Sequence, residues 1–215
     1  MHGQFWVLEG ADGVGKSTQV ALLQKRLLTM GIQSQLLHFP HYDGIPWGTL
    51  IKEYLQGDVG GIEVDPHYAG ILYAADRGEQ KDFIKQTLEA GTWVLADRYA
   101  SSNLAHQGVK IKDPTKRLAY QQWLEKVEFT HFQVVRPTGT ILLSASSKLR
   151  TNQLHHRNQK LDIHEKDSAY LDAVAQEYTH LASTHKWPVV EVSGDEALLP
   201  PEEIAEKIWQ IIQPN

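Results

Sequence analysis

The residues most able to do chemistry lie near the start of the chain. The segment Gly10-Ala11-Asp12-Gly13-Val14-Gly15-Lys16-Ser17-Thr18 matches the pattern G-x-x-x-x-G-K-[ST] in full. In such a loop, glycines let backbone N–H groups turn toward a phosphate, and the N-terminus of the following helix adds a favourable dipole. The Lys16 ammonium can reach the β- and γ-phosphates of a nucleotide, and the Ser17 hydroxyl can coordinate Mg²⁺. An apolar run before the loop and an amphipathic stretch after it favour this interpretation over a chance glycine-rich turn. We therefore predict an ATP site formed by Gly10, Asp12, Gly13, Val14, Gly15, Lys16, Ser17 and Thr18.

A second segment with chemical potential is Asp97-Arg98-Tyr99, which follows the apolar run at residues 93–96. GTPase switches read guanine with N-K-x-D, a tetrapeptide that this sequence lacks. Mechanical ATPases usually end the corresponding strand in Asp-Glu. Here an arginine follows the acidic residue and would place a cation beside the Mg²⁺ and the γ-phosphate, where an acceptor phosphate can lie. This pattern favours phosphoryl transfer onto another phosphate over hydrolysis.

The chain has only seven arginines, and two of them follow an aspartate, in Asp76-Arg77 and Asp97-Arg98. Considered alone, Arg77 is predicted to be a surface ion-pair partner on a helix. Arg98 differs, because it lies at the carboxyl end of a buried strand, where open α/β sheets bind their ligands. The loops that directly follow predicted strands, and that should converge on one crevice, begin at Gly10, Pro40 and Asp97.

The elements that must position these residues alternate in kind, which is typical of β-α-β units around a parallel sheet. Short apolar runs predict strands at residues 5–8, 35–39, 93–96, 140–143 and 189–192. Longer amphipathic stretches predict helices at residues 16–30, 68–90, 115–129, 167–185 and 202–213. Residues 41–64 have no regular pattern apart from a short helix at about 49–55, and residues 144–166 are polar with a basic cluster. The predicted fold is α/β, with a five-stranded parallel sheet and helices on both faces.

Composition limits the classes of protein that this chain can represent. The 215 residues include no cysteine, which excludes disulfide scaffolds and thiolate metal sites, and they predict one domain over residues 1–215. A net charge of −5 argues against a nucleic-acid partner, and no apolar run is long enough to cross a membrane. The N-terminus shows no charged and apolar leader, so we expect a cytoplasmic protein.

These motifs and their order resemble those of the thymidylate kinases, P-loop enzymes that phosphorylate dTMP with ATP. Phe39-Pro40 is similar to the family's FP element, and residues 73–77 to its aromatic-x-x-x-Arg helix. Residues 97–103 resemble the DRY-x-x-SN segment, and residues 160–167 resemble the family's lid. The resemblance implies the P-loop NTPase fold with a flexible lid at about residues 146–166, Mg²⁺ as cofactor, and a homodimer.

The resemblance also implies a role for individual residues. Tyr73 would stack on the thymine ring, Arg77 would lie near the base and its phosphate, and Arg98 would hold the acceptor phosphate. Asp97 would lie near Mg²⁺, together with Ser17. The full set of residues implied to bind the acceptor nucleotide is Asp12, Phe39, Pro40, Tyr42, Tyr73, Arg77, Arg98, Ser102, Asn103 and Gln107. Without the neighbouring motifs, Tyr73 would be interpreted as an ordinary core aromatic, and Asn103 as a helix cap or turn residue.

Two departures from the family pattern carry hypotheses. The P-loop has no arginine, so a lid arginine, Arg150 or Arg157, would have to supply a further catalytic cation. We expect Arg157, which would then act with Lys16 and Arg98. Where the family usually has an arginine after Phe39-Pro40, this chain has His41, which would make acceptor binding sensitive to pH.

Two other functions stay open on the sequence alone. A deoxynucleoside kinase would use a carboxylate to deprotonate a sugar hydroxyl. A nucleotide-binding regulatory protein would bind ATP without transferring its phosphate. The presence of Lys16, Ser17, Asp97 and Arg98 together argues against the second alternative.

Overall fold

The central element of the structure is a five-stranded parallel sheet, as the sequence predicts. The computed structural model describes residues 3–58, 60, 64–150, 167–194 and 197–214. The strand order is β2-β3-β1-β4-β5, and every neighbouring pair is parallel. The strands are β1 (Phe5–Glu9), β2 (Ser34–His38), β3 (Trp93–Asp97), β4 (Gly139–Ser144) and β5 (Val189–Glu191).

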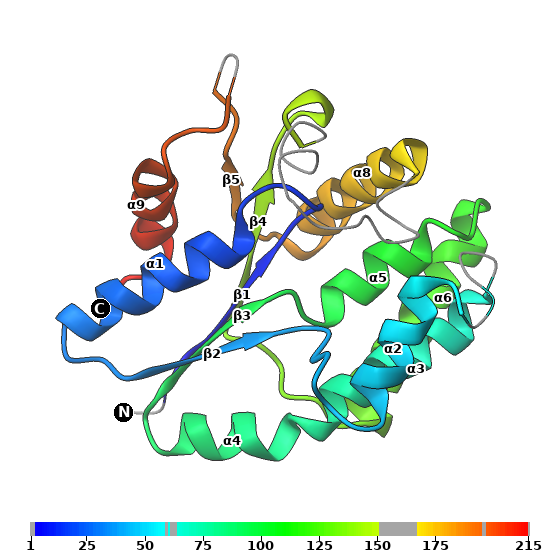
Figure 1. Ribbon diagram of the computed structural model, residues 1–215, viewed down its shortest axis with the longest axis horizontal. Helices are drawn as coiled ribbons and strands as arrows, with labels where there is room; N and C mark the ends of the chain where they lie inside the picture. Colours follow the sequence, from blue (N-terminus) through cyan, green and yellow to red (C-terminus); the bar gives the residue numbers. More distant parts are fainter. Residues whose placement is uncertain (1–2, 59, 61–63, 151–166, 195–196, 215) are drawn as a thin grey trace.

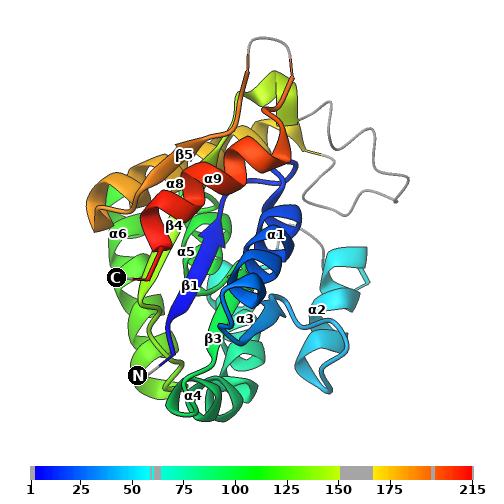
Figure 2. The ribbon, with the colours of Figure 1, turned by 90° about the vertical axis from the view of Figure 1, so that its left-hand side faces the viewer.

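Helices cover both faces of this sheet (Figure 1). Helices α1 and α9 lie on one face, and α4, α5 and α8 lie on the other, with α2, α3 and α6 beyond α5. The view turned by 90° shows α1 and α9 side by side in front of the strands (Figure 2). The helices are α1 (Lys16–Thr29), α2 (Trp47–Gln56), α3 (Pro66–Glu79), α4 (Lys81–Glu89), α5 (Ala100–Gly108), α6 (Pro114–Lys126), α8 (Ser168–His185) and α9 (Pro201–Ile212).

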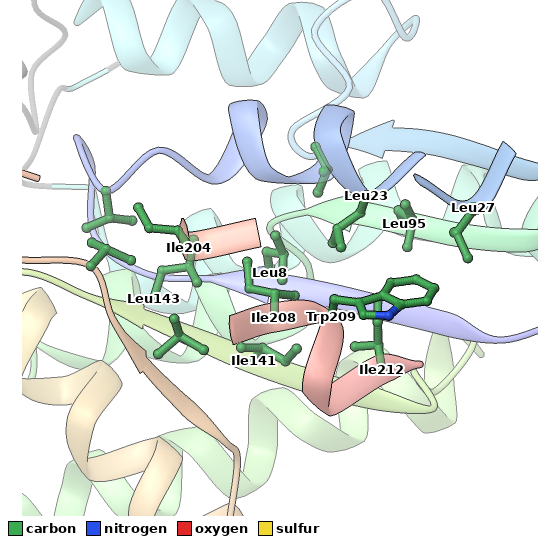
Figure 3. Packing of buried hydrophobic residues seen from close by; sticks show 14 of the residues in the cluster. Leu8, Leu23, Leu27, Leu95, Ile141, Leu143, Ile204, Ile208, Trp209 and Ile212 are labelled. Atoms are coloured by element: carbon green, nitrogen blue, oxygen red, sulfur yellow. The ribbon is translucent and has the colours of Figure 1, made fainter. Parts of the chain in front are cut away.

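The largest hydrophobic cluster joins α1 and α9 to the sheet (Figure 3). Leu8 in β1 and Ile141 in β4 pack against Leu23 of α1 and Ile208 of α9, and all four are almost fully buried. Burial of each such side chain contributes about 2 kcal/mol relative to exposure. This packing fixes the strand that precedes the P-loop against the helix that follows it.

Helices α3, α6 and α8 all begin with the same kind of N-terminal cap. An aspartate side chain accepts a hydrogen bond from a backbone N–H of the first turn, which satisfies a donor that has no partner within the helix. A proline at the first helical position follows two of these aspartates and suits the helical φ angle. The capping aspartates are Asp65 for α3, Asp113 for α6 and Asp167 for α8.

The structure corrects two predictions of helix extent and adds one helix. The predicted helix at 68–90 is wrong as a single element, because α3 ends and α4 begins at Gln80. Helix α3 packs against α2, α5 and α6, whereas α4 packs on β3, so the chain changes direction between them. The helix predicted at 115–129 ends at Lys126 and continues as a π-helical turn at Val127–His131. Helix α5, directly after Asp97-Arg98-Tyr99, was not predicted.

Two further observations concern segments that the sequence singled out. Among the described residues, no helix is both long and apolar enough to span a bilayer. Of the predicted lid, residues 151–166, with Arg157, lie outside the described residues.

Candidate active site

The loop between β1 and α1 has the backbone conformation that its glycines allow. Gly10, Gly13 and Gly15 have φ angles of 146°, 85° and 86°, in the region that residues with a side chain rarely adopt. A Cβ atom on Gly10 would lie 2.5 Å from the Leu143 carbonyl oxygen. Gly15 caps α1, so the first N–H groups of the helix face the loop. This arrangement suits a phosphate group.

Lys16 is buried within the same loop. Its Nζ donates hydrogen bonds to the carbonyl oxygens of Gly10 and Ala11, both at 3.0 Å. Burial, together with the nearby positive charge of Arg98, lowers the pKa of Lys16 to about 8. The ammonium is therefore held close to the loop but is poorly solvated, a setting in which an added phosphate would stabilise its charge.

Asp97, at the end of β3, lies beside Ser17. One of its carboxylate oxygens, Oδ2, accepts a hydrogen bond from the Ser17 hydroxyl and lies 3.3 Å from Nδ1 of His38. The other oxygen, Oδ1, is buried and has no hydrogen-bond partner among the described residues. Burial raises the pKa of Asp97, but His38, Lys16 and Arg98 outweigh it, so that pKa lies well below its ordinary value. An ionised carboxylate with an unpartnered oxygen next to a hydroxyl fits Mg²⁺, which prefers hard oxygen ligands.

Arg98 connects the P-loop to the helices. Its backbone is left-handed, with a φ of 69°, which turns the chain sharply after β3. Nη2 lies 2.5 Å from the Asp12 carboxylate. Burial alone would lower the pKa of Arg98, but Asp12 and the other acidic groups nearby outweigh it and raise that pKa. The acceptors around Nη1 are the Tyr178 hydroxyl at 3.0 Å, the Ser102 hydroxyl at 3.2 Å and Nε2 of His106 at 3.3 Å. The guanidinium is thus positioned by side chains from the P-loop, α5 and α8.

All ten residues that the resemblance assigns to the acceptor nucleotide line one cavity. This cavity lies between the P-loop, the loop after β2, and helices α2, α3 and α5. The residues that line it without having been predicted are Leu55, Tyr99 and His106. The ten predicted residues are Asp12, Phe39, Pro40, Tyr42, Tyr73, Arg77, Arg98, Ser102, Asn103 and Gln107. The structure therefore brings the predicted set together, and the role of each residue stays a prediction.

Arg77 is not on the surface, so the prediction made from its helix alone is wrong. Only 2% of its side chain is exposed, and Glu128 forms an equally buried ion pair with it. Nε donates to Glu128 Oε2 at 3.0 Å, and Nη2 donates to Oε1. Two opposite charges removed from water satisfy one another in this bidentate geometry. Arg77 thus borders the cavity as one half of a fixed pair.

Two amide side chains of α5 present acceptors that nothing in the described chain satisfies. Asn103 donates from Nδ2 to the Gly70 carbonyl and to Glu128, both at 2.9 Å, which orients its oxygen. Asn103 Oδ1 and Gln107 Oε1 are both buried and have no hydrogen-bond partner among the described residues. A buried acceptor without a partner costs about 1–3 kcal/mol, so a ligand that donates a hydrogen bond would be favoured.

Two residues that the departures from the family pattern bring into question, His41 and Arg150, are not among the residues that line this cavity. His41 donates its backbone N–H to Asp76, and its Nδ1 lies 3.4 Å from Gln80 Nε2; it is not among the lining residues. Arg150 is buried and forms an ion pair with Asp172 at 2.7 Å. Its main chain packs on the P-loop, where a Cβ atom on Gly13 would lie 2.7 Å from the Arg150 carbonyl oxygen.

Sequence reasoning missed several residues that support the site. Glu9 is fully buried at the end of β1 and accepts hydrogen bonds from the backbone of Tyr99 and Ser102 and from two hydroxyls, those of Ser102 and Tyr178. Burial raises the pKa of Glu9 despite these bonds. An acidic residue that ends an apolar strand directly before the P-loop was the available signal. For Glu128 and Tyr178, no local sequence signal marks the role.

The fold and this geometry define a class of protein. A P-loop after the first strand, a carboxylate beside its serine, and an arginine that contacts the loop and lines the adjoining cavity are the parts of a P-loop nucleotide kinase. The sequence model of the family described as thymidylate kinase matches residues 8–208. The chain belongs to the thymidylate kinase family, and it is an ATP-dependent nucleoside monophosphate kinase that phosphorylates dTMP.

Individual relatives agree with this assignment. A thymidylate kinase of Thermomicrobium roseum is 32% identical, over 97% of this chain and 93% of the relative. A thymidylate kinase of Deinococcus radiodurans is 30% identical, over 98% and 97% of the two chains. The solved thymidylate kinase of Candida albicans superimposes with a TM-score of 0.76 at 24% identity, over 99% of this chain and 92% of that one, and so supports the fold.

Proposed function

We propose that this chain transfers the γ-phosphoryl group of ATP to dTMP, with Lys16 and Arg98 holding the two nucleotides at their phosphates. The observation that carries this proposal is the position of Arg98. Its guanidinium contacts Asp12 of the P-loop and lines the same cavity as Tyr73 and Asn103. A cation at that point can contact an acceptor phosphate and the group in transfer.

The mechanism needs alignment and charge stabilisation more than acid–base chemistry. Phosphoryl transfer passes through a loose transition state, and the acceptor phosphate is already a nucleophile. The P-loop N–H groups and Lys16 would bind the donor phosphates, and Arg98 would offset the repulsion between the two anions. In binding, Arg98 would exchange its contact with Asp12 at 2.5 Å for the incoming phosphate.

The cavity chemistry supports a pyrimidine acceptor. Tyr73 and Phe39 offer aromatic surface to a planar base, and Tyr73 packs edge-on against Tyr54 with ring centroids 6.4 Å apart. The buried oxygens of Asn103 and Gln107 lack hydrogen-bond partners among the described residues. A thymine ring carries an N3–H donor that would satisfy one of them. Cytosine has no proton at this nitrogen and donates only from its amino group, so an oxygen that faces N3 would favour thymine or uracil.

The Ser17 hydroxyl and Asp97 would hold Mg²⁺ next to the donor phosphates. When bound, Mg²⁺ neutralises charge on the β- and γ-phosphates. No cluster of three or more histidine or acidic side chains suited to a metal ion occurs among the described residues. The remaining ligands would therefore be phosphate oxygens and water, which Mg²⁺ retains readily.

A lid cation would complete the site. Arg150 is held by Asp172 and by the Leu171 carbonyl oxygen, which supports the choice of Arg157 as the residue that reaches the donor phosphates. Turnover should fall in Arg157→Ala and remain nearly unchanged in Arg150→Ala. The opposite pattern would identify Arg150 as the lid cation.

We further propose that the protein is a cytoplasmic homodimer. Exposed apolar side chains on neighbouring helices support an interface there, with Tyr68 and Ile71 on α3 and Leu118 on α6. Sedimentation velocity would test this, and a single species of monomer mass across micromolar concentrations would contradict it.

The decisive experiment measures ADP release with one acceptor at a time. Thymidine, dTMP, dUMP, dCMP and dAMP are offered separately at saturating ATP and Mg²⁺. We expect release with dTMP, less with dUMP and little with the others. Release with thymidine but not dTMP would indicate a deoxynucleoside kinase. Tight ATP binding without release for any acceptor would indicate a regulatory protein.

A further inference from the structure

We propose that His106 is a positioning residue that holds the Arg98 guanidinium for the acceptor phosphate only while its imidazole is neutral. The proposal rests on the proposed function, because it concerns the acceptor side of the same reaction. His106 lies on α5 and lines the cavity, and no motif in the sequence assigns it a role.

Hydrogen bonds fix the tautomer of this imidazole. The Tyr170 hydroxyl donates to the backbone carbonyl oxygen of His106 at 2.9 Å, so its single proton is in use. Nδ1 of His106 lies 3.2 Å from the same hydroxyl oxygen, and with that proton on the carbonyl we assign Nδ1 as the donor of this contact. Nε2 is then left with a lone pair, 3.3 Å from Arg98 Nη1, where it accepts a hydrogen bond from the guanidinium.

The ring has little freedom to turn away from this geometry. It lies between the two tyrosines of α8, with ring centroids 6.1 Å from Tyr170 and 6.0 Å from Tyr178. Tyr178 and Ser102 also accept from Nη1 of Arg98. Because three acceptors share this nitrogen, loss of His106 weakens the orientation of the guanidinium without releasing it entirely.

Protonation of His106 has a different effect from its removal. An imidazolium carries a proton on Nε2, which would point a donor and a positive charge at Arg98. Within the described part of the chain, charged and titratable groups that face the ring include Arg98 from the loop after β3, Asp12 from the P-loop, and Tyr170 and Tyr178 from α8, with Glu9 behind Tyr178. Asp12 would attract an imidazolium and compete with Arg98 for it. Protonation should therefore pull the Arg98–Asp12 arrangement apart.

The test compares two substitutions of His106 whose amide side chains differ in length. In His106→Gln the terminal amide can present its oxygen near the position of Nε2, whereas His106→Asn reaches only as far as Nδ1. At pH 8 we expect the KM for dTMP to be unchanged in His106→Gln and about fivefold higher in His106→Asn, with the KM for ATP unchanged in both. The dTMP phosphate itself titrates near pH 6. We therefore divide the wild-type KM for dTMP by that of His106→Gln at each pH. The titration of the dTMP phosphate affects both values equally and cancels in this ratio.

This ratio should rise at least about threefold as the pH falls from about 8 to 5.5, the range in which histidine titrates. His180→Gln, at an exposed histidine on α8, serves as the matched control and should keep the wild-type pH profile. A flat ratio, or a fall that would show the imidazolium binding phosphate, would overturn the proposal. Equal KM values for His106→Gln and His106→Asn would overturn it as well. ADP release by the wild type with dTMP at pH 8 tests the proposed function separately. A failure of the proposed function can therefore be distinguished from a failure of the proposal for His106.

Discussion

The chain contains two Asp-Arg dipeptides in different structural settings. Asp76-Arg77 lies inside α3, where the helical backbone satisfies its own hydrogen bonds and Arg77 forms a buried bidentate pair with Glu128. Asp97-Arg98 lies where β3 ends, and there the left-handed backbone of Arg98 directs the side chain toward the P-loop. The same dipeptide thus supplies the arginine of a fixed pair with Glu128 in one place and the arginine of a set of exchangeable contacts in the other.

The two aspartates differ in the same sense. Burial raises the pKa of Asp76, and the backbone N–H of His41 does not fully offset that effect. Asp97 keeps a pKa below its ordinary value, because His38 and the cations Lys16 and Arg98 outweigh burial. Each has one buried oxygen without a partner among the described residues, but only that of Asp97 lies beside the P-loop serine. The direction of the pKa shift and the neighbouring serine distinguish Asp97, the predicted Mg²⁺ ligand, from Asp76.

The largest expected effect concerns the structural pair. Glu128→Ala leaves the buried charge of Arg77 without a partner and removes an acceptor of Asn103. We expect the free energy of unfolding to fall by about 4 kcal/mol, measured by urea denaturation. Glu89→Ala, an exposed control on α4, should change it by less than about 0.5 kcal/mol. A loss below about 1 kcal/mol for Glu128→Ala would show that the pair is not a structural anchor.

The next effect concerns Arg98 and should appear in catalysis. Arg98→Ala removes the cation that would stabilise the charge in transfer, and turnover with dTMP should fall by about 100- to 1,000-fold. Arg98→Lys should recover only part of this loss, because an ammonium cannot reproduce the forked geometry. The exposed Arg26→Ala on α1 serves as the control. Steady-state ADP release measures all three, and near-normal turnover in Arg98→Ala would remove the distinction between the two arginines.

A third comparison exchanges the two aspartates for asparagine. Asp97→Asn keeps the shape of the side chain but removes the negative charge beside Ser17, so the Mg²⁺ concentration for half-maximal activity should rise about tenfold. Asp76→Asn should leave that concentration unchanged. Magnesium titration of ADP release distinguishes the two variants, and an equal shift in both would show that the effect is not local to the P-loop.

The sequence predicts the surroundings of Asp97 and Arg98 better than those of Asp76 and Arg77. The P-loop and the residues after β3 are encoded locally, since glycines and a buried strand fix the position of Lys16 and Arg98. The burial of Arg77 depends on Glu128, which is 51 residues away and carries no local mark. The break between α3 and α4 likewise depends on which surfaces the two helices cover, and the helical period continues across it. The orientation of His106 depends on Tyr170, a contact between helices that no pattern in one segment can indicate.

The smallest expected effect concerns Lys16. Its buried charge should lower the free energy of unfolding of the ligand-free protein. In the folded protein the pKa of Lys16 is about 8, below the ordinary 10.5, because burial and Arg98 disfavour its charged form. Below pH 8 the folded state therefore carries a buried charge that the unfolded state exposes. The shift corresponds to about 3 kcal/mol, of which the two hydrogen bonds to loop carbonyls offset about 2. Lys16→Met should accordingly be more stable than the wild type by about 1 kcal/mol at pH 7.

The sign of the pH dependence makes this prediction specific. Between pH 8 and 10.5 the unfolded wild type binds more protons at Lys16 than the folded wild type does, so wild-type stability rises with pH. Because this gain is about 3 kcal/mol, the advantage of Lys16→Met should shrink and then reverse across that range in urea denaturation at successive pH values. Lys25→Met, an exposed substitution on the same helix, should show no such change with pH. If the stability advantage of Lys16→Met is constant with pH, the buried charge of Lys16 is not its cause. The site around Lys16 and Arg98 would then not differ from the Arg77–Glu128 pair in lowering the stability of the ligand-free fold.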